Sequence, residues 1–93
     1  MFHHVVTFSL KEGADAGVTA ERLRSLAHTV ESVKHIEVGI DIGRTPRSVD
    51  LALITRFADR DGYQSYAVHP AHKEVLAYMG TVVTNASVVD WSD

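Results

Sequence analysis

The stretch of sequence that decides the fold is residues 49–57, VDLALITRF. Its residues from Leu51 to Ile54 are apolar at four successive positions. Side chains of a β-strand point alternately to its two faces, so this pattern places apolar groups on both faces. We therefore expect a strand over residues 49–57 whose two faces are both covered.

Three more segments have the patterns of strands, namely residues 2–10, 36–42 and 86–91. In the first of them, His4, Val6 and Phe8 share one face. His3 and Val5 lie on the opposite face, because neighbouring residues of a strand point in opposite directions. His3 and His4 are therefore not expected to bind one metal ion together.

Apolar residues at helical spacing predict helices between these strands. The first helix has one apolar stripe, made of Leu23, Leu26, Ala27, Val30 and Val33. Thr19 can cap its N-terminus. A short helix over residues 58–66 breaks before His69 and Pro70, and Pro70 opens the last helix, because proline is tolerated at the first helical position. The last helix is expected to end near Asn85, and its stripe contains Val75, Leu76, Met79, Val82 and Val83.

The resulting order of elements is β-α-β-β-α-β, with a break in the second helical region. This is the order of the ferredoxin-like α+β fold, in which a four-stranded antiparallel sheet carries its helices on one face. The sequence contains no linker, repeat or low-complexity segment. We therefore expect residues 1–93 to form a single domain.

The second face of such a sheet would be open and partly apolar. Four strands leave several hundred Å² of exposed surface on this face, and a monomer rarely exposes an apolar patch above about 300–600 Å². No segment of the chain is long enough to cover this face. Two copies packed face to face around a twofold axis would bury it, so we expect a homodimer.

Composition excludes several classes of function. The 93 residues include no Cys and carry a net charge of -3, so disulfides, thiolate catalysis and Cys-ligated zinc are excluded. Lys and Arg are not concentrated in any stretch, and a nucleic-acid partner is not expected. The longest apolar run is too short to cross a bilayer, and the N-terminus lacks the features of a signal peptide. We therefore expect a cytoplasmic protein with no membrane partner.

Imidazole is the most reactive side chain available, and the chain has six His. His72 lies three and seven residues before Val75 and Met79, so it shares the inward stripe of the last helix. His4 belongs to the strand face that is expected to meet the helices. We expect both imidazoles to line a small apolar pocket, where a neutral His can act as a general base. The alternative is that both are core histidines satisfied by backbone groups or by each other.

Tyr66 is the tyrosine nearest to these histidines in sequence, and it could polarise a bound carbonyl group; alternatively, it is a packing residue. His69 and His72 have a spacing that can serve a metal ion, but no third ligand is nearby, so we expect no metal. We also expect no nucleotide cofactor, because the chain has no P-loop or dinucleotide motif. Asp90, at the end of the last strand, is interpreted as a carboxylate that caps a rim or pairs with an Arg.

Four segments of the chain carry a family resemblance. They are His4-Val5-Val6-Thr7-Phe8, Asp50-Leu51-Ala52-Leu53 leading to Phe57, Tyr66-Ala67-Val68-His69-Pro70-Ala71-His72, and Val89-Asp90-Trp91. Together they resemble the stress-responsive A/B barrel domain family, often abbreviated Dabb, and the Tyr-x-x-His-Pro-x-His segment is the most specific. The resemblance runs nearly end to end and implies a dimeric α+β barrel built from two ferredoxin-like subunits.

The same resemblance implies less about activity. Most domains of this type have no assigned reaction, some are associated with stress protection, and a few similar proteins are cofactor-independent polyketide cyclases or lyases that use an inward His. By position, it implies His72, His4 and Tyr66 as candidate site residues. Leu51 and Leu23 stand where cyclase-like members place a His and a Tyr, so this chain departs from part of the cyclase pattern.

Three functions remain open from the sequence. The first is binding of a small apolar or aromatic ligand in a His-lined pocket, without turnover. The second is a cofactor-independent lyase, a polyketide cyclase-like enzyme or a monooxygenase-like enzyme, in which His72 is the general base and Tyr66 polarises a carbonyl oxygen. The third is a structural module that builds larger assemblies.

Overall fold

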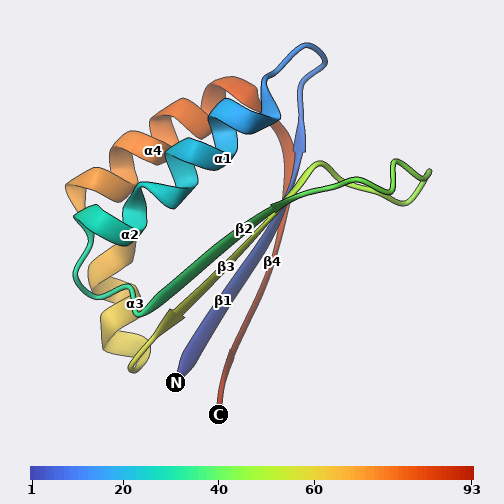
Figure 1. Cartoon of the computed structure of the whole chain (residues 1–93). Coiled ribbons are helices and arrows are strands. Elements are labelled where there is room, and N and C mark those ends of the chain that lie inside the picture. The colour runs from blue at the N-terminus through green and yellow to red at the C-terminus, as the bar shows by residue number, and fades with distance from the viewer.

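The computed structural model describes all 93 residues of the chain as four strands and four helices. In chain order they are β1 (Phe2–Leu10), α1 (Ala16–Arg24), α2 (Leu26–Thr29), β2 (His35–Ile40), β3 (Leu51–Phe57), α3 (Arg60–Ala67), α4 (Pro70–Val82) and β4 (Val83–Ser92). All of the helices lie on one side of the sheet (Figure 1). None of these helices has both the length and the apolar character that crossing a membrane requires.

The sheet has the order β2-β3-β1-β4, and every neighbouring pair is antiparallel. The two central strands, β1 and β3, are not consecutive in sequence, and the connections between strands carry the helices to one face. The ferredoxin-like α+β fold expected from the sequence is confirmed. In the register of the central strands, Val6 lies between Leu53 on β3 and Val88 on β4.

Burial confirms the helix-facing side of the expected strand, which begins at Leu51 rather than at residue 49; its second face, also expected to be covered, is only partly covered in the single chain. Leu51, Leu53 and Phe57 are buried beneath the helices, whereas Ala52 and Ile54 on the other face are only partly covered. Burial of Phe57 is complete, at 0% exposure. The helix-facing side of the sheet therefore forms the core, and the opposite side of this strand remains open in the single chain.

We call this second side of the sheet the open face. Its central row crosses three strands, because Ile54 and Val89 both lie opposite Val5. Val89 is 62% exposed. A polar cluster adjoins the row, in which the Arg56 Nε donates to the His3 Nδ1 at 3.3 Å and the His3 ring stacks on Trp91. Arg56 therefore pairs within its own chain.

The start of the first helix differs from the sequence expectation. Asp15, not Thr19, caps α1, because the Asp15 carboxylate accepts from the Val18 backbone N–H at 3.1 Å. Thr19 is buried one turn later, where its hydroxyl contacts the Tyr78 hydroxyl at 3.0 Å. The expected single helix is also divided at Ser25 into α1 and α2, and Ala27 becomes exposed. The apolar stripe alone could not show this division.

Two predicted boundaries near the strands were also wrong. Ile42, expected at the end of the second strand, lies beyond β2 and is 95% exposed. The last helix ends at Val82 rather than near Asn85, and β4 begins at the next residue. Pairing of β4 with β1 extends to Val83, so the hydrogen bonds of the sheet override the helical pattern there.

Candidate functional site

A cavity of about 280 Å³ lies on the helix side of the sheet, between α4 and the half of the sheet formed by β1 and β4. Its fourteen lining residues are apolar or aromatic except for two imidazoles: His4, Val6, Phe8, Leu23, Leu26, Leu53, Tyr63, Tyr66, His72, Val75, Leu76, Met79, Ala86 and Val88. Leu76 on α4 and Val88 on β4 are each more than half exposed, so the mouth of the cavity lies between these two elements.

The turn between α3 and α4 positions His72. The His69 side chain caps α4 by accepting from the Ala71 N–H at 3.0 Å, and Pro70 occupies the first position of the helix. His72 follows in the first turn, with its Nδ1 at 3.2 Å from the Ala67 carbonyl oxygen. A carbonyl oxygen only accepts hydrogen bonds, so Nδ1 carries the proton and the neutral ring keeps a lone pair on Nε2.

The surroundings of His72 favour its neutral form. Burial lowers the pKa of His72 most, and the nearby His4 and His69 lower it further, against the opposing effect of the Ala67 carbonyl. A neutral imidazole at neutral pH can accept a proton at Nε2. This is the protonation state that a general base requires.

Tyr66 fills the space beside His72. It is 1% exposed, and its ring centroid lies 4.2 Å from that of His72 and 5.1 Å from that of Phe57. Its hydroxyl makes no hydrogen bond within the chain, and burial raises the pKa of Tyr66, so the hydroxyl stays protonated. A protonated phenol without a partner at a cavity wall can donate a hydrogen bond to a bound oxygen atom.

His4 is held by a residue whose contribution the sequence analysis missed. The His4 Nδ1 lies 2.5 Å from the Asp90 Oδ1, because His4 on β1 and Asp90 on β4 face each other in the register. The carboxylate accepts from the Nδ1–H, so in the neutral form of the ring the lone pair is on Nε2. Asp90 was interpreted as a rim carboxylate; only the register of β4, which local pattern does not give, could have linked it to His4.

The structure brings the three sequence-predicted residues to one cavity. The ring of His4 lies 6.5 Å from that of Tyr66, which in turn contacts His72. Tyr63 joins them, with its ring 4.8 Å from His4, and burial together with the charge of Asp90 raises its pKa. The titratable groups therefore gather at one end of an otherwise apolar cavity. The functional roles of these residues stay predictions.

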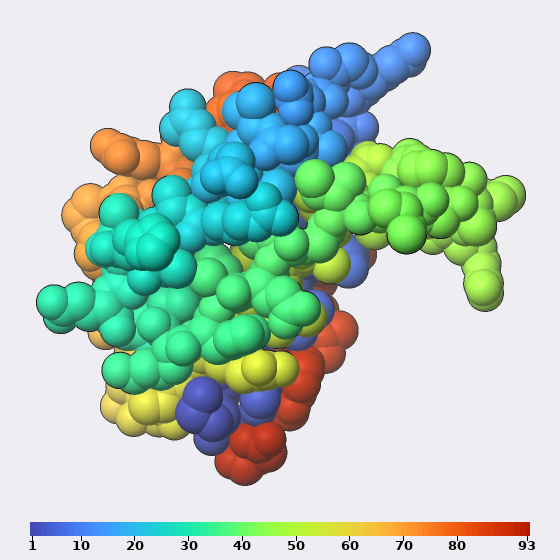
Figure 2. All heavy atoms as spheres, viewed as in Figure 1, coloured from blue at the N-terminus to red at the C-terminus, as the bar shows by residue number.

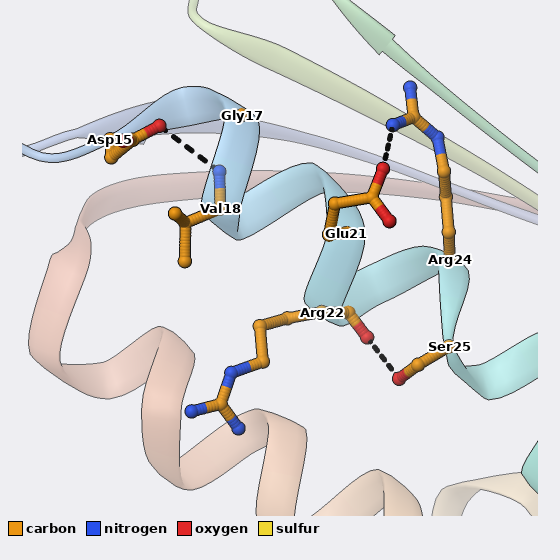
Figure 3. Close-up of a pocket in the computed structure, with 7 residues that line it drawn as sticks. All are labelled: Asp15, Gly17, Val18, Glu21, Arg22, Arg24 and Ser25. Carbon is orange, nitrogen blue, oxygen red and sulfur yellow. Dashed lines mark hydrogen bonds and ion pairs between the residues drawn. The ribbon is translucent and has the colours of Figure 1, made fainter.

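A wider hollow, of about 670 Å³, lies over α1 (Figure 3). It is lined by Asp15, Gly17, Val18, Glu21, Arg22, Arg24 and Ser25, all of them exposed. Its Glu21–Arg24 ion pair, at 3.0 Å, is a solvent-exposed contact between residues three apart on one helix. Such a pair contributes little, and no buried reactive group points to chemistry there. The described chain also contains no group of three or more His, Asp or Glu residues that could hold a metal ion.

The lowered pKa of His72 predicts a pH-dependent stability. Above the usual imidazole pKa of 6.5, His72 is neutral in both the folded and the unfolded chain, so its full contribution is present. As pH falls through 6.5 towards the lowered pKa, the unfolded chain binds the proton more readily, and the free energy of unfolding decreases. We expect a loss of less than about 1 kcal/mol, because the ring is only partly buried and solvent still stabilises its charged form. Urea unfolding between pH 7.5 and 5 measures it.

The matched control for this titration is His72→Gln, which keeps a side chain that can hydrogen-bond but cannot titrate. The His72→Gln variant should show a smaller decrease in stability over the same pH range. Asp41 and Asp93 have pKa values lowered below 3.8, so their contributions are lost only at lower pH. Equal pH slopes for the wild type and the variant would contradict the prediction.

Comparison with known proteins places this geometry in a family. The chain matches the Stress responsive A/B Barrel Domain over residues 2–93. It is 27% identical over 97 residues to a stress-response A/B barrel domain-containing protein of Arabidopsis thaliana, a match that covers 97% of this chain and 84% of the relative.

Two solved structures show how widely the fold is shared. A dimeric ferredoxin-like protein of unknown function from Bacteroides fragilis superposes with a TM-score of 0.83 at 22% identity, covering 99% of this chain and 95% of that one. The hydroxynitrile lyase of Passiflora edulis superposes with a TM-score of 0.85 at 13% identity, covering 97% and 90%. At these identities the likeness extends to the fold alone. On the family match over residues 2–93, the chain belongs to the stress-responsive A/B barrel domain family.

Proposed function

We propose that this protein binds a small, largely apolar carbonyl compound, of which an aromatic ketone is the simplest type, in the cavity between α4 and β4. The observation that carries the proposal is the unpartnered hydroxyl of Tyr66 beside the neutral ring of His72, at one end of an apolar cavity. Apolar cavities of about 150 Å³ can bind benzene, so about 280 Å³ admits an aromatic ring with a short substituent.

The polar end of the cavity defines the chemistry of the ligand. The Tyr66 hydroxyl can donate to a carbonyl oxygen, and the Nε2 atoms of His72 and His4 can accept from an acidic O–H or C–H group. The remaining wall gains binding energy only from apolar surface. A ligand that combines a carbonyl group with an apolar body satisfies both parts.

A second candidate function is cofactor-independent proton transfer, as in a lyase, a polyketide cyclase-like enzyme or a monooxygenase-like enzyme. It is favoured by the Ala67 carbonyl, which holds the proton on the Nδ1 of His72 and leaves Nε2 as the base. In this reaction His72 would accept a proton from the carbon next to the carbonyl group. Negative charge would then develop on the carbonyl oxygen, where the Tyr66 hydroxyl donates. The hydroxynitrile lyase of similar fold supplies a precedent for the fold only.

Acetophenone and ethylbenzene test the binding proposal, because ethylbenzene has the same ring and two-carbon substituent but lacks the carbonyl oxygen. We expect acetophenone to shift the imidazole NMR signals of His4 and His72 and to bind about tenfold more tightly than ethylbenzene, as one net hydrogen bond of about 1.4 kcal/mol predicts. Tyr66→Phe should remove this preference. If neither compound perturbs either imidazole, the binding proposal fails.

Deuterium exchange at the acetophenone methyl group in D2O tests the second candidate directly. Exchange requires removal of a proton next to the carbonyl group, which is the step assigned to His72. The wild type should exceed His72→Gln by about 100-fold, a typical contribution of a positioned general base. Exchange at the rate of buffer alone, with acetophenone bound, would leave the binding function and reject the enzymatic one.

We further propose that the protein is a homodimer joined through its open face. The support is the row of Ile54, Val5 and Val89, which carries apolar side chains on a face that no element of the chain covers. The Bacteroides fragilis structure of the same fold is described as dimeric. A larger assembly and a cytoplasmic location stay predictions.

A further inference from the structure

The segment between β2 and β3, residues 41–50, projects from the sheet on the side away from the helices (Figure 1). We call it the arm. In the space-filling view it stands clear of the rest of the molecule (Figure 2). Every residue from Ile42 to Arg47 is exposed, and Ile42 is 95% exposed. The arm therefore presents a large apolar side chain beyond the open face.

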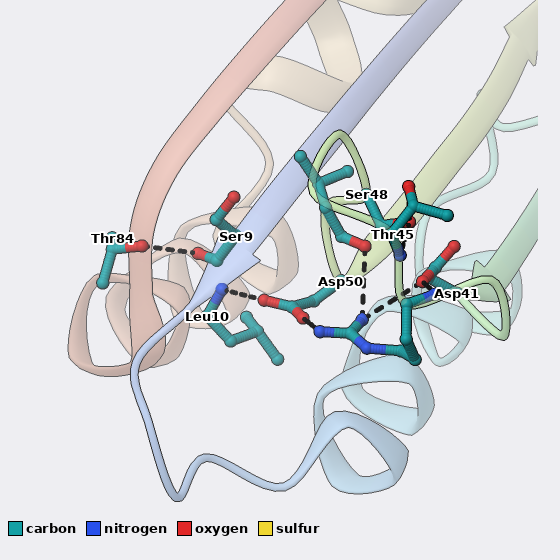
Figure 4. A network of polar contacts seen from close by, with 9 residues as sticks. Ser9, Leu10, Asp41, Thr45, Ser48, Asp50 and Thr84 are labelled. Carbon is teal, nitrogen blue, oxygen red and sulfur yellow. Dashed lines mark hydrogen bonds and ion pairs between the residues drawn. The ribbon is translucent and has the colours of Figure 1, made fainter.

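The arm is braced by the guanidinium group of Arg44, which forms ion pairs with Asp41 and Asp50, the two carboxylates labelled in Figure 4. This group lies 3.2 Å from the Asp41 carboxylate and 3.0 Å from the Asp50 carboxylate, so it joins the two ends of the arm. Arg44 itself has a φ of 48°, in the left-handed region that non-glycine residues rarely adopt. The Arg44 backbone N–H donates to Asp41, and this bond is the main reason that the pKa of Asp41 is lowered.

The base of the arm is tied to the central strand β1. The Asp50 carboxylate accepts from the Leu10 N–H at 2.7 Å, and the Asp50 N–H donates to the Phe8 carbonyl oxygen at 2.9 Å. Asp41 closes the base by donating its N–H to the Asp50 carbonyl oxygen at 2.9 Å. The direction of the arm is therefore set by the sheet.

The tip of the arm is also ordered. The Thr45 N–H donates to the Ser48 hydroxyl at 2.9 Å, and the Ser48 N–H donates to the Thr45 carbonyl oxygen at 3.0 Å. Pro46 lies between them and restricts the backbone further. Ordering a surface loop costs conformational entropy. Because Ile42 is almost wholly exposed, packing of its side chain within the chain does not offset that cost.

We propose that the arm is a clamp that packs Ile42 against the open face of a second copy of this chain. The proposal rests on the homodimer proposed above. The same chain carries both halves of the contact: an exposed apolar residue on a braced arm, and an apolar row, Ile54, Val5 and Val89, on the side to which the arm projects. A twofold axis then forms the contact twice, so each arm contributes once to the same interface.

The charges on the arm and on the open face also favour a second copy of this chain as the partner of the arm. Arg47 on the arm makes no ion pair within the chain, whereas Asp41 and Asp50 both pair with Arg44, and the four charges of the arm sum to zero. Arg47 is therefore the charged group of the arm that has no partner in its own chain, and it lies on the same arm as the exposed Ile42. The open face carries Glu37 as a counter-charge in the second copy; its carboxylate is 63% exposed and contacts the His35 ring of its own chain at 3.3 Å. A copy of this chain thus offers both apolar and acidic groups to the arm.

A spin label on the arm tests the contact between copies. The chain has no Cys, so Ile42→Cys provides a unique attachment point for a nitroxide. The labelled protein is mixed with ¹⁵N-labelled wild type after joint unfolding and refolding, and only the wild-type copy is observed. We expect the nitroxide to broaden amide signals around Val5 and Val89, and its reduction to restore them. A mixed dimer without this broadening would overturn the clamp, whereas a monomer at all concentrations would overturn the homodimer itself.

The contribution to affinity is measured with Ile42→Ser and a matched control. Val68→Ser changes an apolar residue that is also largely exposed, at 64%, but follows α3 on the helix side. We expect Ile42→Ser to raise the dimer dissociation constant at least tenfold, because two Ile contacts are lost, and Val68→Ser to change it less than threefold. Equal constants for Ile42→Ser and the wild type would contradict the clamp even if the dimer forms.

Discussion

Val89→Asp is expected to separate the two copies while leaving each copy folded. Val89 is 62% exposed in the single chain, so the substitution should alter the stability of the monomer little. In the proposed dimer it would bury an unpaired carboxylate in each copy, and an unpaired buried charge costs about 3 kcal/mol or more. Because the dimer contains two such charges, we expect its dissociation constant to rise about 10⁴-fold or more. Sedimentation across a concentration series measures it.

Val18→Asp is the control for that substitution. Val18 is also about half exposed, at 48%, but it lies in the first turn of α1 on the helix side. An added carboxylate near the N-terminus of a helix is tolerated by the helix dipole. Val18→Asp should therefore leave the dissociation constant unchanged. If Val89→Asp behaves like this control and both remain dimers, the copies associate through a different surface.

Tyr66→Ala is expected to reduce the free energy of unfolding by about 3–5 kcal/mol, the cost typical of truncating a buried aromatic ring. Tyr66 is among the largest fully buried side chains, and it packs against Phe57 and His72. The total free energy of unfolding of a small domain is only about 5–15 kcal/mol, so the variant should be close to unfolding. Chemical denaturation of the two proteins under identical conditions measures the difference.

Tyr66→Phe separates the role of the ring from that of the hydroxyl. The hydroxyl makes no hydrogen bond within the chain, so its removal should change stability by less than about 1 kcal/mol. Tyr66→Phe should instead reduce the affinity for a carbonyl ligand. A large loss of stability in Tyr66→Phe would show that the hydroxyl serves the fold, and the case for a ligand-directed donor would then be withdrawn.

The fold followed from local patterns, because a strand or helix shows its period within a few residues. Leu51 to Ile54 identified a strand with two apolar faces, and the structure confirms the ferredoxin-like sheet built around it. The first and last residues of the helices and strands were predicted less accurately from these patterns. Asp15 caps α1, although Thr19 was the expected cap. Both residue types cap helices, and only the packing of the helix in the fold determines which of them is at its first position.

The candidate site was predictable in part. His72 shares a helical stripe with Val75 and Met79, and His4 shares a strand face with Val6, so periodicity alone directed both to the helix side of the sheet. Asp90 could not be assigned in this way. Its contact with His4 joins residues 86 positions apart and depends on the pairing of β4 with β1.

The amino-acid sequence by itself determined the kinds of elements, the side of the sheet on which the imidazoles lie, and the excess of apolar surface on β3. These properties repeat every two or about 3.6 residues, so they can be recognised without knowing what lies elsewhere in the chain. Only the tertiary structure decided that Asp90 holds His4, that the Tyr66 hydroxyl is left without a partner, and that Arg44 braces the arm. Each of these depends on where side chains from separate elements or turns finally meet, and that placement is set by strand register and packing rather than by local pattern.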